Sequence, residues 1–292
     1  MLRLYKLALR RYSADGTIAR RSSSTRLLEW SIKKAVLLLM RLQRMTFPER
    51  GIGGWWWTWR WRLEILMGWY EYDSVAWSRR LIRPGMTVVD IGAHVGYYTR
   101  LFSRLVGPSG TVLAFESHPE NFAVLRKNVC GLKHRNVKLF EAALADQVGS
   151  IRLYVSPGSS NHSLLEGFTQ AEEVIEVKST ALDTVLSEIG IDRIDFVKID
   201  VEGAEPLVLA GMQQTISRSP HMNLLIEYNP TALACGGVEP KEMVGVLQKA
   251  GFQVGIIRPD GVLDDIAGGL QSDYVNLLCQ KPKSISRRLT IF

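Results

Sequence analysis

Four carboxylic acids stand at the ends of four apolar runs that the sequence predicts to be β-strands. These acids are Asp90, Glu116, Asp200 and Glu227. Ligands of open α/β sheets bind beyond the carboxyl ends of parallel strands, near the point where the strand order reverses. The acids therefore predict one ligand site at that edge of the sheet. Carboxylates there favour a ligand with hydroxyl groups or positive charge.

The turn that follows Asp90 contains two glycines, Gly92 and Gly96, and leads into a helical pattern. Glycine adopts backbone angles closed to other residues and lets the chain approach a ligand closely, while the N-terminus of the next helix offers free N–H groups. A phosphate ligand would require a GxGxxG turn or a Walker lysine, and Gly92-Ala-His-Val-Gly96 has neither. Asp90 would also repel a pyrophosphate.

Glu116 stands 24 residues after Gly92. This spacing is close to the interval of roughly 20 residues at which an acid accepts hydrogen bonds from a ribose diol. Glu116 therefore indicates an adenosine-type ligand, and Asp90 favours a cationic one. Adenosine that carries a positive charge describes S-adenosylmethionine.

From Met86 onward the chain alternates β-branched apolar runs with helical patterns, which is typical of a parallel sheet. Strands of the sheet are expected at 86–91, 111–116, 137–141, 194–200, 223–228, 252–258 and 273–280. Helices are expected at 97–105, 119–130, 181–188, 204–211 and 240–250. An insertion carries two more strands, 150–155 and 173–179, around a polar loop at 157–163. We predict an α/β fold with a seven-stranded, mostly parallel sheet, helices on both faces and one antiparallel strand at the end.

Three segments resemble the FkbM-type family of S-adenosylmethionine-dependent methyltransferases. They are Asp90–Thr99, Glu116 with Pro119 and Asn128, and above all Phe196–Glu205. The resemblance covers about residues 80–280 and implies a class I methyltransferase (Rossmann-like) sheet with S-adenosylmethionine as cofactor. One departure is His94, which stands where Asn or Gly is more usual. Asn, Gly and His all tolerate unusual backbone angles, so the turn can still form.

The resemblance also implies which residues hold the cofactor. The expected cofactor-binding residues are Asp90, Gly92, Gly96, Glu116, Asp146 and Asp200. Among them, Asp146 lies past the third strand, where the family's adenine contact is expected, although a loop acid without that role fits the sequence equally well. Asp200 is assigned to the methionine or sulfonium side of the cofactor.

Catalysis requires that the protein align a nucleophile with the methyl group and, for a hydroxyl acceptor, remove its proton. Glu202 or Glu227 is the expected catalytic base, because Asp200 and Glu202 share strand parity and Glu227 ends the next strand. His94 is the other candidate base, although a histidine in a turn often only contacts the backbone.

Structural roles remain open for two of the acids. Glu202 or Glu205 could cap the helix expected at 204–211 or pair with Lys198. Asp200, Glu227 and Asn229 also form an alternative set of oxygen ligands for magnesium. We nevertheless expect no metal in the site.

The net charge of +7 is confined to the start of the chain. Residues 1–50 hold twelve Lys/Arg and three Asp/Glu, a balance of +9, so residues 51–292 carry 7 − 9 = −2. A nearly neutral body lacks the basic surface that nucleic-acid binding requires, so no nucleic-acid partner is expected.

The three cysteines, Cys130, Cys235 and Cys279, have no disulfide or zinc-ligand spacing. We expect a reducing compartment and cytoplasmic localisation.

The chain divides into a basic mobile tail at 1–25, an amphipathic and Trp-rich helical extension at 26–80, a methyltransferase domain at 81–282 and a C-terminal tail at 283–292. All eight tryptophans lie between Trp30 and Trp77. The basic helix expected at 27–45 is shorter in its apolar run than the roughly 20 residues that span a bilayer. Residues 27–77 either pack on the domain, form a lip for the substrate, or make a peripheral membrane contact.

The leading hypothesis is an S-adenosylmethionine-dependent O-methyltransferase that acts on a hydroxyl of a sugar, glycolipid or secondary metabolite. Its expected partner is a small-molecule or glycan acceptor, and protein methylation is a further option. Two alternatives come from other classes. One is a membrane-surface or partner-binding module with an inactive methyltransferase fold. The other is a dinucleotide-dependent oxidoreductase, against which the missing GxGxxG turn counts.

Overall fold

The computed structural model describes residues 62–157, 161–258, 263–265 and 274–282, together with Ser31, Lys34 and Leu38, which are helical. The described residues up to Tyr72 belong to a different unit from those that begin at Asp73. The tails at 1–25 and 283–292, and most of the extension at 26–80, lie outside the described residues. Our expectations for those segments therefore stay predictions.

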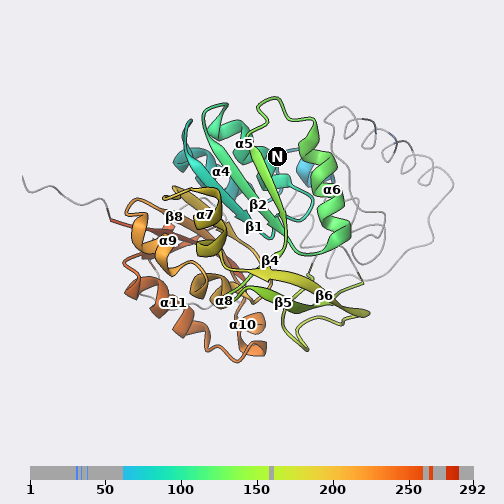
Figure 1. The fold of residues 1–292 in the computed structure, drawn as a ribbon, viewed down its shortest axis with the longest axis vertical. Helices are drawn as coiled ribbons and strands as arrows, with labels where there is room; N and C mark the ends of the chain where they lie inside the picture. The colour runs from blue at the N-terminus through green and yellow to red at the C-terminus, as the bar shows by residue number, and fades with distance from the viewer. Residues whose placement is uncertain are drawn as a thin grey trace, which may run out of the picture. The chain divides into compact units, whose positions relative to one another are not determined.

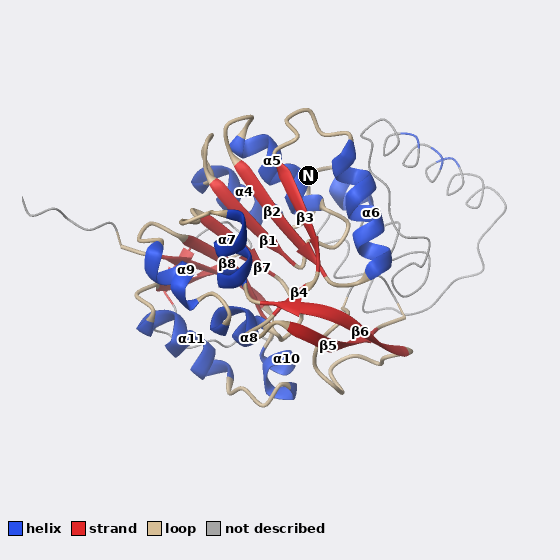
Figure 2. Ribbon diagram, viewed as in Figure 1, coloured by secondary structure: helices blue, strands red, loops and turns tan. Residues whose placement is uncertain are grey.

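One large sheet forms the centre of the second unit (Figures 1 and 2). Its strands are β1 (Thr87–Ile91), β2 (Thr111–Glu116), β3 (Val137–Glu141), β7 (Phe196–Ile199), β8 (Asn223–Tyr228), β9 (Gln253–Ile257), β10 (Leu263–Asp265) and β11 (Val275–Gln280). They lie in the order β10-β9-β11-β8-β7-β1-β2-β3. All seven predicted strands are present, and the short β10 adds an eighth at the edge. β11 runs antiparallel to both neighbours, β8 and β9, as expected for the last strand.

Helices cover both faces of this sheet, as predicted. They are α4 (Tyr72–Leu81), α5 (Tyr97–Val106), α6 (Pro119–Cys130), α7 (Leu182–Ile189), α8 (Glu205–Ala210), α9 (Gln213–Arg218), α10 (Pro230–Cys235) and α11 (Pro240–Lys249). Successive strand residues point to opposite faces. Val89 and Ile91 accordingly join a core with residues of α7, α8, α9 and α11. Val88 joins a separate core with residues of α4 and α5.

The central strands are buried along almost their whole length, because helices cover both of their faces. Near-continuous apolar runs are therefore what made these strands recognisable in the sequence. Two polar residues interrupt this pattern within β1 and β7. Val88 and Phe196 pack against α5. Asp90 and Lys198 stand two residues after them on β1 and β7, so their side chains lie on the same α5 side of the sheet.

A second, three-stranded sheet forms the insertion, in the order β4-β6-β5. It contains β4 (Ala143–Leu144), β5 (Gly149–Val155) and β6 (Glu173–Thr180), of which β5 and β6 match the two predicted strands. The sequence analysis did not predict β4, β10, α9 or α10. Each of these elements has six residues or fewer, and so short a segment shows no full hydrophobic period.

All three cysteines are free thiols, with Cys279 buried in β11 and Cys130 and Cys235 exposed. Within the part of the chain that the structure describes, no helix combines the length and the apolar character needed to cross a bilayer.

Candidate active site

The turn between β1 and α5 has left-handed backbone at Gly92 (φ +76°), His94 (φ +51°) and Gly96 (φ +86°). A Cβ atom on Gly92 would lie 1.8 Å from the backbone oxygen of Asp200, so no side chain fits there. His94 tolerates its positive φ, and the departure from the usual Asn or Gly therefore leaves the turn intact. The turn lies directly against the chain that leaves β7.

Glu116 fixes this turn from the end of β2. Its Oε2 atom accepts a hydrogen bond from the His94 N–H (2.7 Å), and its Oε1 atom accepts one from the His118 N–H (2.9 Å). Burial raises the pKa of Glu116 to about 7, although these two N–H groups favour the charged form. The Asn121 side chain also hydrogen-bonds to Glu116. A carboxylate has about four acceptor positions, so Glu116 retains the capacity to bind a ribose hydroxyl.

Asp90 is fully buried in β1. Its Oδ2 atom accepts a hydrogen bond from the Thr99 hydroxyl of α5 (2.5 Å), whereas its Oδ1 atom has no partner among the described residues. Burial raises the pKa of Asp90, and the positive charge of Lys198 opposes that rise. The site thus contains a buried carboxylate oxygen with unused capacity to accept a hydrogen bond.

Lys198 places a positive charge between two of the acids. It lies beside Asp90 in the register of β1 and β7, and its Nζ atom is 2.6 Å from Oδ2 of Asp200. The ammonium group also lies 4.7 Å from the centre of the Tyr98 ring, a cation–π contact. Since Lys198 is only 5% exposed, this ion pair is largely shielded from water.

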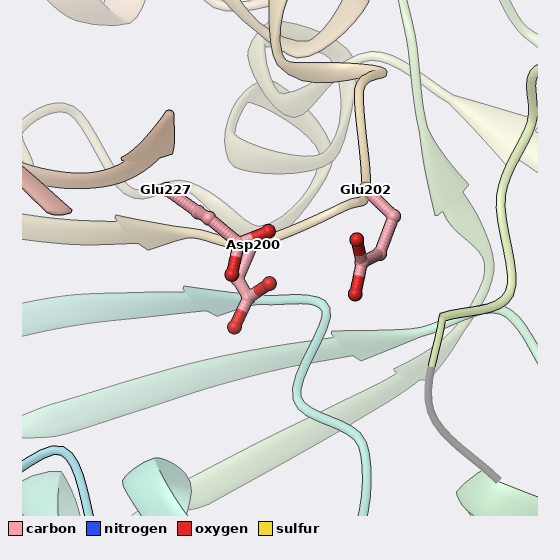
Figure 3. Close-up of side chains that lie close together, drawn as sticks. All are labelled: Asp200, Glu202 and Glu227. Carbon is pink, nitrogen blue, oxygen red and sulfur yellow. The ribbon is translucent and has the colours of Figure 1, made fainter. Parts of the chain in front are cut away.

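Three acids gather where β7 and β8 end (Figure 3). Asp200, Glu202 and Glu227 each place a carboxylate oxygen within 4.8 Å of the other two. β7 ends at Ile199, so Glu202 reaches this acid cluster through a turn with φ +51° and not as a strand residue. Strand parity correctly predicted that Glu202 lies beside Asp200, but the backbone turn, and not the strand, places Glu202 there.

Crowding changes the protonation of the acid cluster. Burial, together with the charges of Asp200 and Glu205, raises the pKa of Glu202 to about 8. Burial and the charges of Asp200 and Glu202 raise the pKa of Glu227 well above its ordinary value. The Tyr274 hydroxyl donates a hydrogen bond to Glu227. The pKa of Glu202 therefore lies close to neutral pH, which suits a group that accepts a proton as general base.

Glu205 has a structural role in this turn. Its Oε1 atom accepts hydrogen bonds from the N–H groups of Val201 and Gly203, both at 3.2 Å. The two bonds hold the turn that carries Glu202. This role is structural, but it differs from the helix cap that the sequence suggested, because no side chain among the described residues caps α8. Lys198 pairs with Asp200.

The acid cluster offers the oxygen ligands that hard divalent cations prefer. Two of its members, Asp200 and Glu227, belong to the magnesium set that the sequence suggested, and Glu202 is a further one. The Asn229 side chain instead caps α10, where its Oδ1 atom accepts a hydrogen bond from the Ala232 N–H (3.2 Å). A divalent ion would compete with the ammonium group of Lys198 for Asp200.

The predicted site residues form two neighbouring groups. One group is the β1–α5 turn together with the acid that holds it, and comprises Gly92, His94, Gly96 and Glu116. The other group is the acid cluster of Asp200, Glu202 and Glu227. The contact between Gly92 and the backbone of Asp200 joins the groups. Asp146 is exposed and lies just past β4.

Two further histidines, His118 and His162, were not predicted from the sequence as residues of this site. The rings of His118 and His162 lie 4.3 Å apart, centre to centre, and are inclined by 39°. The position of His118, two residues after a strand-end acid, was a signal that could have been used. His162 lies in the loop after β5, far from any motif, and the sequence offered no comparable signal for it.

These features fit the expected cofactor. The buried Oδ1 atom of Asp90 and the acid cluster supply negative potential for a cation. Glu116 supplies hydrogen-bond acceptors for a ribose, and the backbone of the β1–α5 turn lies against Glu116 and Asp200.

Several known proteins that this chain resembles are methyltransferases. The family model described as "Methyltransferase FkbM domain" matches residues 90–254. The chain is 28% identical over 201 residues to the 2-O-methyltransferase NoeI of Sinorhizobium fredii, covering 64% of this chain and 80% of NoeI. It is 33% identical over 162 residues to the 31-O-demethyl-FK506 methyltransferase FkbM of Streptomyces tacrolimicus, covering 45% and 61% of the two chains.

A third relative is the hexuronic acid methyltransferase AglP of Haloferax volcanii, 24% identical over 213 residues, with 72% of this chain and 77% of AglP covered. Among solved structures, an S-adenosylmethionine-dependent methyltransferase from Aquifex aeolicus aligns with a TM-score of 0.42 and 16% identity, over 73% of this chain and 90% of that one.

Proposed function

The chain belongs to the FkbM family of S-adenosylmethionine-dependent methyltransferases, and we propose that it methylates a hydroxyl oxygen of a small polyhydroxylated molecule. A sugar unit of a glycan, a glycolipid or a secondary metabolite is the acceptor class that we favour. Membership of this family favours methyl transfer over the hydride transfer of a dinucleotide-dependent oxidoreductase.

The observation that carries the proposal is the acid cluster. A hydroxyl is a weak nucleophile, so its methylation requires a group that accepts the proton. Glu202 and Glu227 have raised pKa values and lie beside Asp200, next to the turn expected to hold the cofactor. Acceptors that need no deprotonation would not require such a cluster.

When bound, S-adenosylmethionine supplies a methyl group on a positively charged sulfur. The acceptor oxygen forms a bond to the methyl carbon while the carbon–sulfur bond breaks, and the hydroxyl proton passes to a carboxylate of the acid cluster. S-adenosylhomocysteine and a methyl ether are the products. Glu116 and the β1–α5 turn would hold the ribose, while Asp90 and Asp200 would face the cationic side.

The printed names of the relatives support the choice of acceptor. NoeI is named a 2-O-methyltransferase, FkbM is named a 31-O-demethyl-FK506 methyltransferase, and AglP is named for hexuronic acid. Two of these names specify methylation of oxygen, and the third specifies a sugar acid. Carboxylates of the acid cluster would also accept hydrogen bonds from the hydroxyls of a sugar.

Calorimetry with Glu116→Ala tests the cofactor assignment. We expect S-adenosylmethionine to bind the wild type and to bind the variant at least about tenfold more weakly, because hydrogen bonds to a charged group are lost. Glu141→Ala is the matched control, since Glu141 is exposed and lies opposite Glu116 in the register of β2 and β3. Unchanged affinity in Glu116→Ala would contradict the ribose assignment.

A labelling experiment tests the acceptor class. The wild-type protein is incubated with tritiated S-adenosylmethionine and a lysate, which is then separated into glycan, lipid and protein fractions. We expect label in the glycan or glycolipid fraction, in a base-stable ether linkage. Label confined to protein would contradict the proposed acceptor, and no transfer to any fraction would support the alternative of an inactive fold.

A further inference from the structure

The loop between β5 and β6 reaches both groups of the active site with two adjacent residues. His162 lies against the ring of His118, 4.3 Å between centres. Ser163 donates a hydrogen bond from its hydroxyl to the backbone oxygen of Glu202 (2.7 Å). The loop therefore spans from the expected cofactor side to the turn that carries a candidate base.

His162 contacts one of the two histidines that hold the acid expected to bind the ribose. His118, its ring neighbour, donates its backbone N–H to Oε1 of Glu116, and His94 donates to Oε2. Both His118 and His94 also act electrostatically on His162. Two histidines thus hold Glu116, and His162 lies beside them from a third segment of the chain.

The hydrogen bonding of His162 determines which ring nitrogen carries the proton. Its Nδ1 atom lies 3.2 Å from the backbone N–H of Ser156 and accepts a hydrogen bond from it. The proton of the neutral ring is therefore on Nε2. This Nε2 atom is buried and has no hydrogen-bond partner among the residues that the structure describes. A buried donor without a partner is unfavourable, and a ligand acceptor would satisfy it.

The charge state of His162 narrows the kind of ligand. Burial and the two neighbouring histidines lower the pKa of His162 to about 3, so the ring is neutral at physiological pH. A neutral aromatic ring with one N–H donor suits a purine, which offers a flat face and ring-nitrogen acceptors. It does not suit a phosphate group, which favours cationic partners.

We propose that His162 is a cofactor-binding residue that contacts the purine of the adenosine with its ring and its Nε2–H group. This inference rests on the proposed function, because it assumes that Glu116 holds the ribose of the same nucleoside. It adds to the site a residue from the insertion, outside the βαβ segments that carry the motifs. Ser163, the next residue, links that contact to the turn of Glu202.

Calorimetry on the full chain tests this assignment with two probes, S-adenosylhomocysteine and adenosine alone. The variants are His162→Ala, which removes ring and donor, and His162→Phe, which keeps a ring and removes the donor. His134→Ala is the matched control, because His134 is only partly buried and lies in the turn before β3. Circular dichroism and thermal melting establish that each variant is folded.

We expect His162→Ala to bind both probes about tenfold more weakly, His162→Phe to fall between it and the wild type, and His134→Ala to match the wild type. An equal loss for both probes would place the contact on the adenosine and not on the methionine part. Wild-type affinity in both His162 variants would overturn this inference but would leave the proposed function unaffected. Failure of the wild type to bind S-adenosylhomocysteine would overturn the proposed function and this inference with it.

Discussion

The backbone oxygen of Asp200 occupies the space that a side chain on Gly92 would need, because a Cβ atom built on Gly92 would lie 1.8 Å from it. The β1–α5 turn and the chain leaving β7 are therefore in direct backbone contact. This contact sets the distance between the expected cofactor turn and the acid cluster. Any residue larger than glycine at position 92 must push the two apart.

Gly92→Ala is accordingly expected to lower the free energy of unfolding and abolish cofactor binding. The left-handed backbone alone costs alanine about 1 kcal/mol, and the clash with backbone adds roughly 1–3 kcal/mol. Gly190→Ala is the matched control, since Gly190 has φ +69° and nothing within 4 Å of an added Cβ. Urea denaturation measures both variants. Equal destabilisation would contradict the role given to the contact with Asp200.

The buried acids predict a stability that falls as pH rises. Burial raises the pKa values of Glu116 and Glu205 to about 7, above their ordinary value of 4.5. Between these pH values the unfolded chain releases protons that the folded protein still binds, so increasing pH favours unfolding. We expect the free energy of unfolding to fall by about 1 kcal/mol or more from pH 5 to pH 7.

Denaturation of Glu205→Gln at each pH tests the contribution of one acid. Glutamine keeps an Oε1 acceptor for the N–H groups of Val201 and Gly203 but cannot titrate. The decrease in stability between pH 5 and pH 7 should therefore be smaller in this variant. Glu172→Gln, at an exposed position, should leave it unchanged. A pH profile identical in Glu205→Gln and the wild type would show that Glu205 does not titrate in this range.

The fold was predictable because hydrophobic periodicity marks long, buried elements, and β2, α6, β3 and β8 begin and end where the sequence predicts. The acids at strand ends were predictable for the same reason, since the end of a strand fixes where its last side chain lies. Glu202 and His162 depend on loop conformation, which has no period. Asn229 appeared as a metal ligand in the sequence, but its position before Pro230 makes it a helix cap.

Chelation should leave methyl transfer unchanged. Lys198 already neutralises Asp200 at 2.6 Å, and a divalent ion in the acid cluster would be repelled by this ammonium group. The measurement is turnover after dialysis against EDTA, with and without added magnesium. Activity that is lost on chelation and restored by magnesium would contradict this prediction and assign Asp200, Glu202 and Glu227 as metal ligands.

Glu202 is the residue that we expect to accept the acceptor's proton. Its side chain is partly exposed, so an acceptor can reach it, whereas Glu227 is only 5% exposed and already accepts a hydrogen bond from Tyr274. Glu202→Gln should lower kcat by roughly 10²–10⁴-fold. Glu227→Gln should have a smaller effect, similar to that of Tyr274→Phe.

The pH dependence separates a base from a residue that only positions the substrate. In the wild type, kcat/KM for the acceptor should rise with pH, because only the charged carboxylate can accept a proton. Its apparent pKa should lie at or below the value of about 8 found for Glu202, since the positive charge of the bound cofactor favours the carboxylate. This rise should disappear in Glu202→Gln and persist in Glu227→Gln. The reverse pattern would assign the base to Glu227.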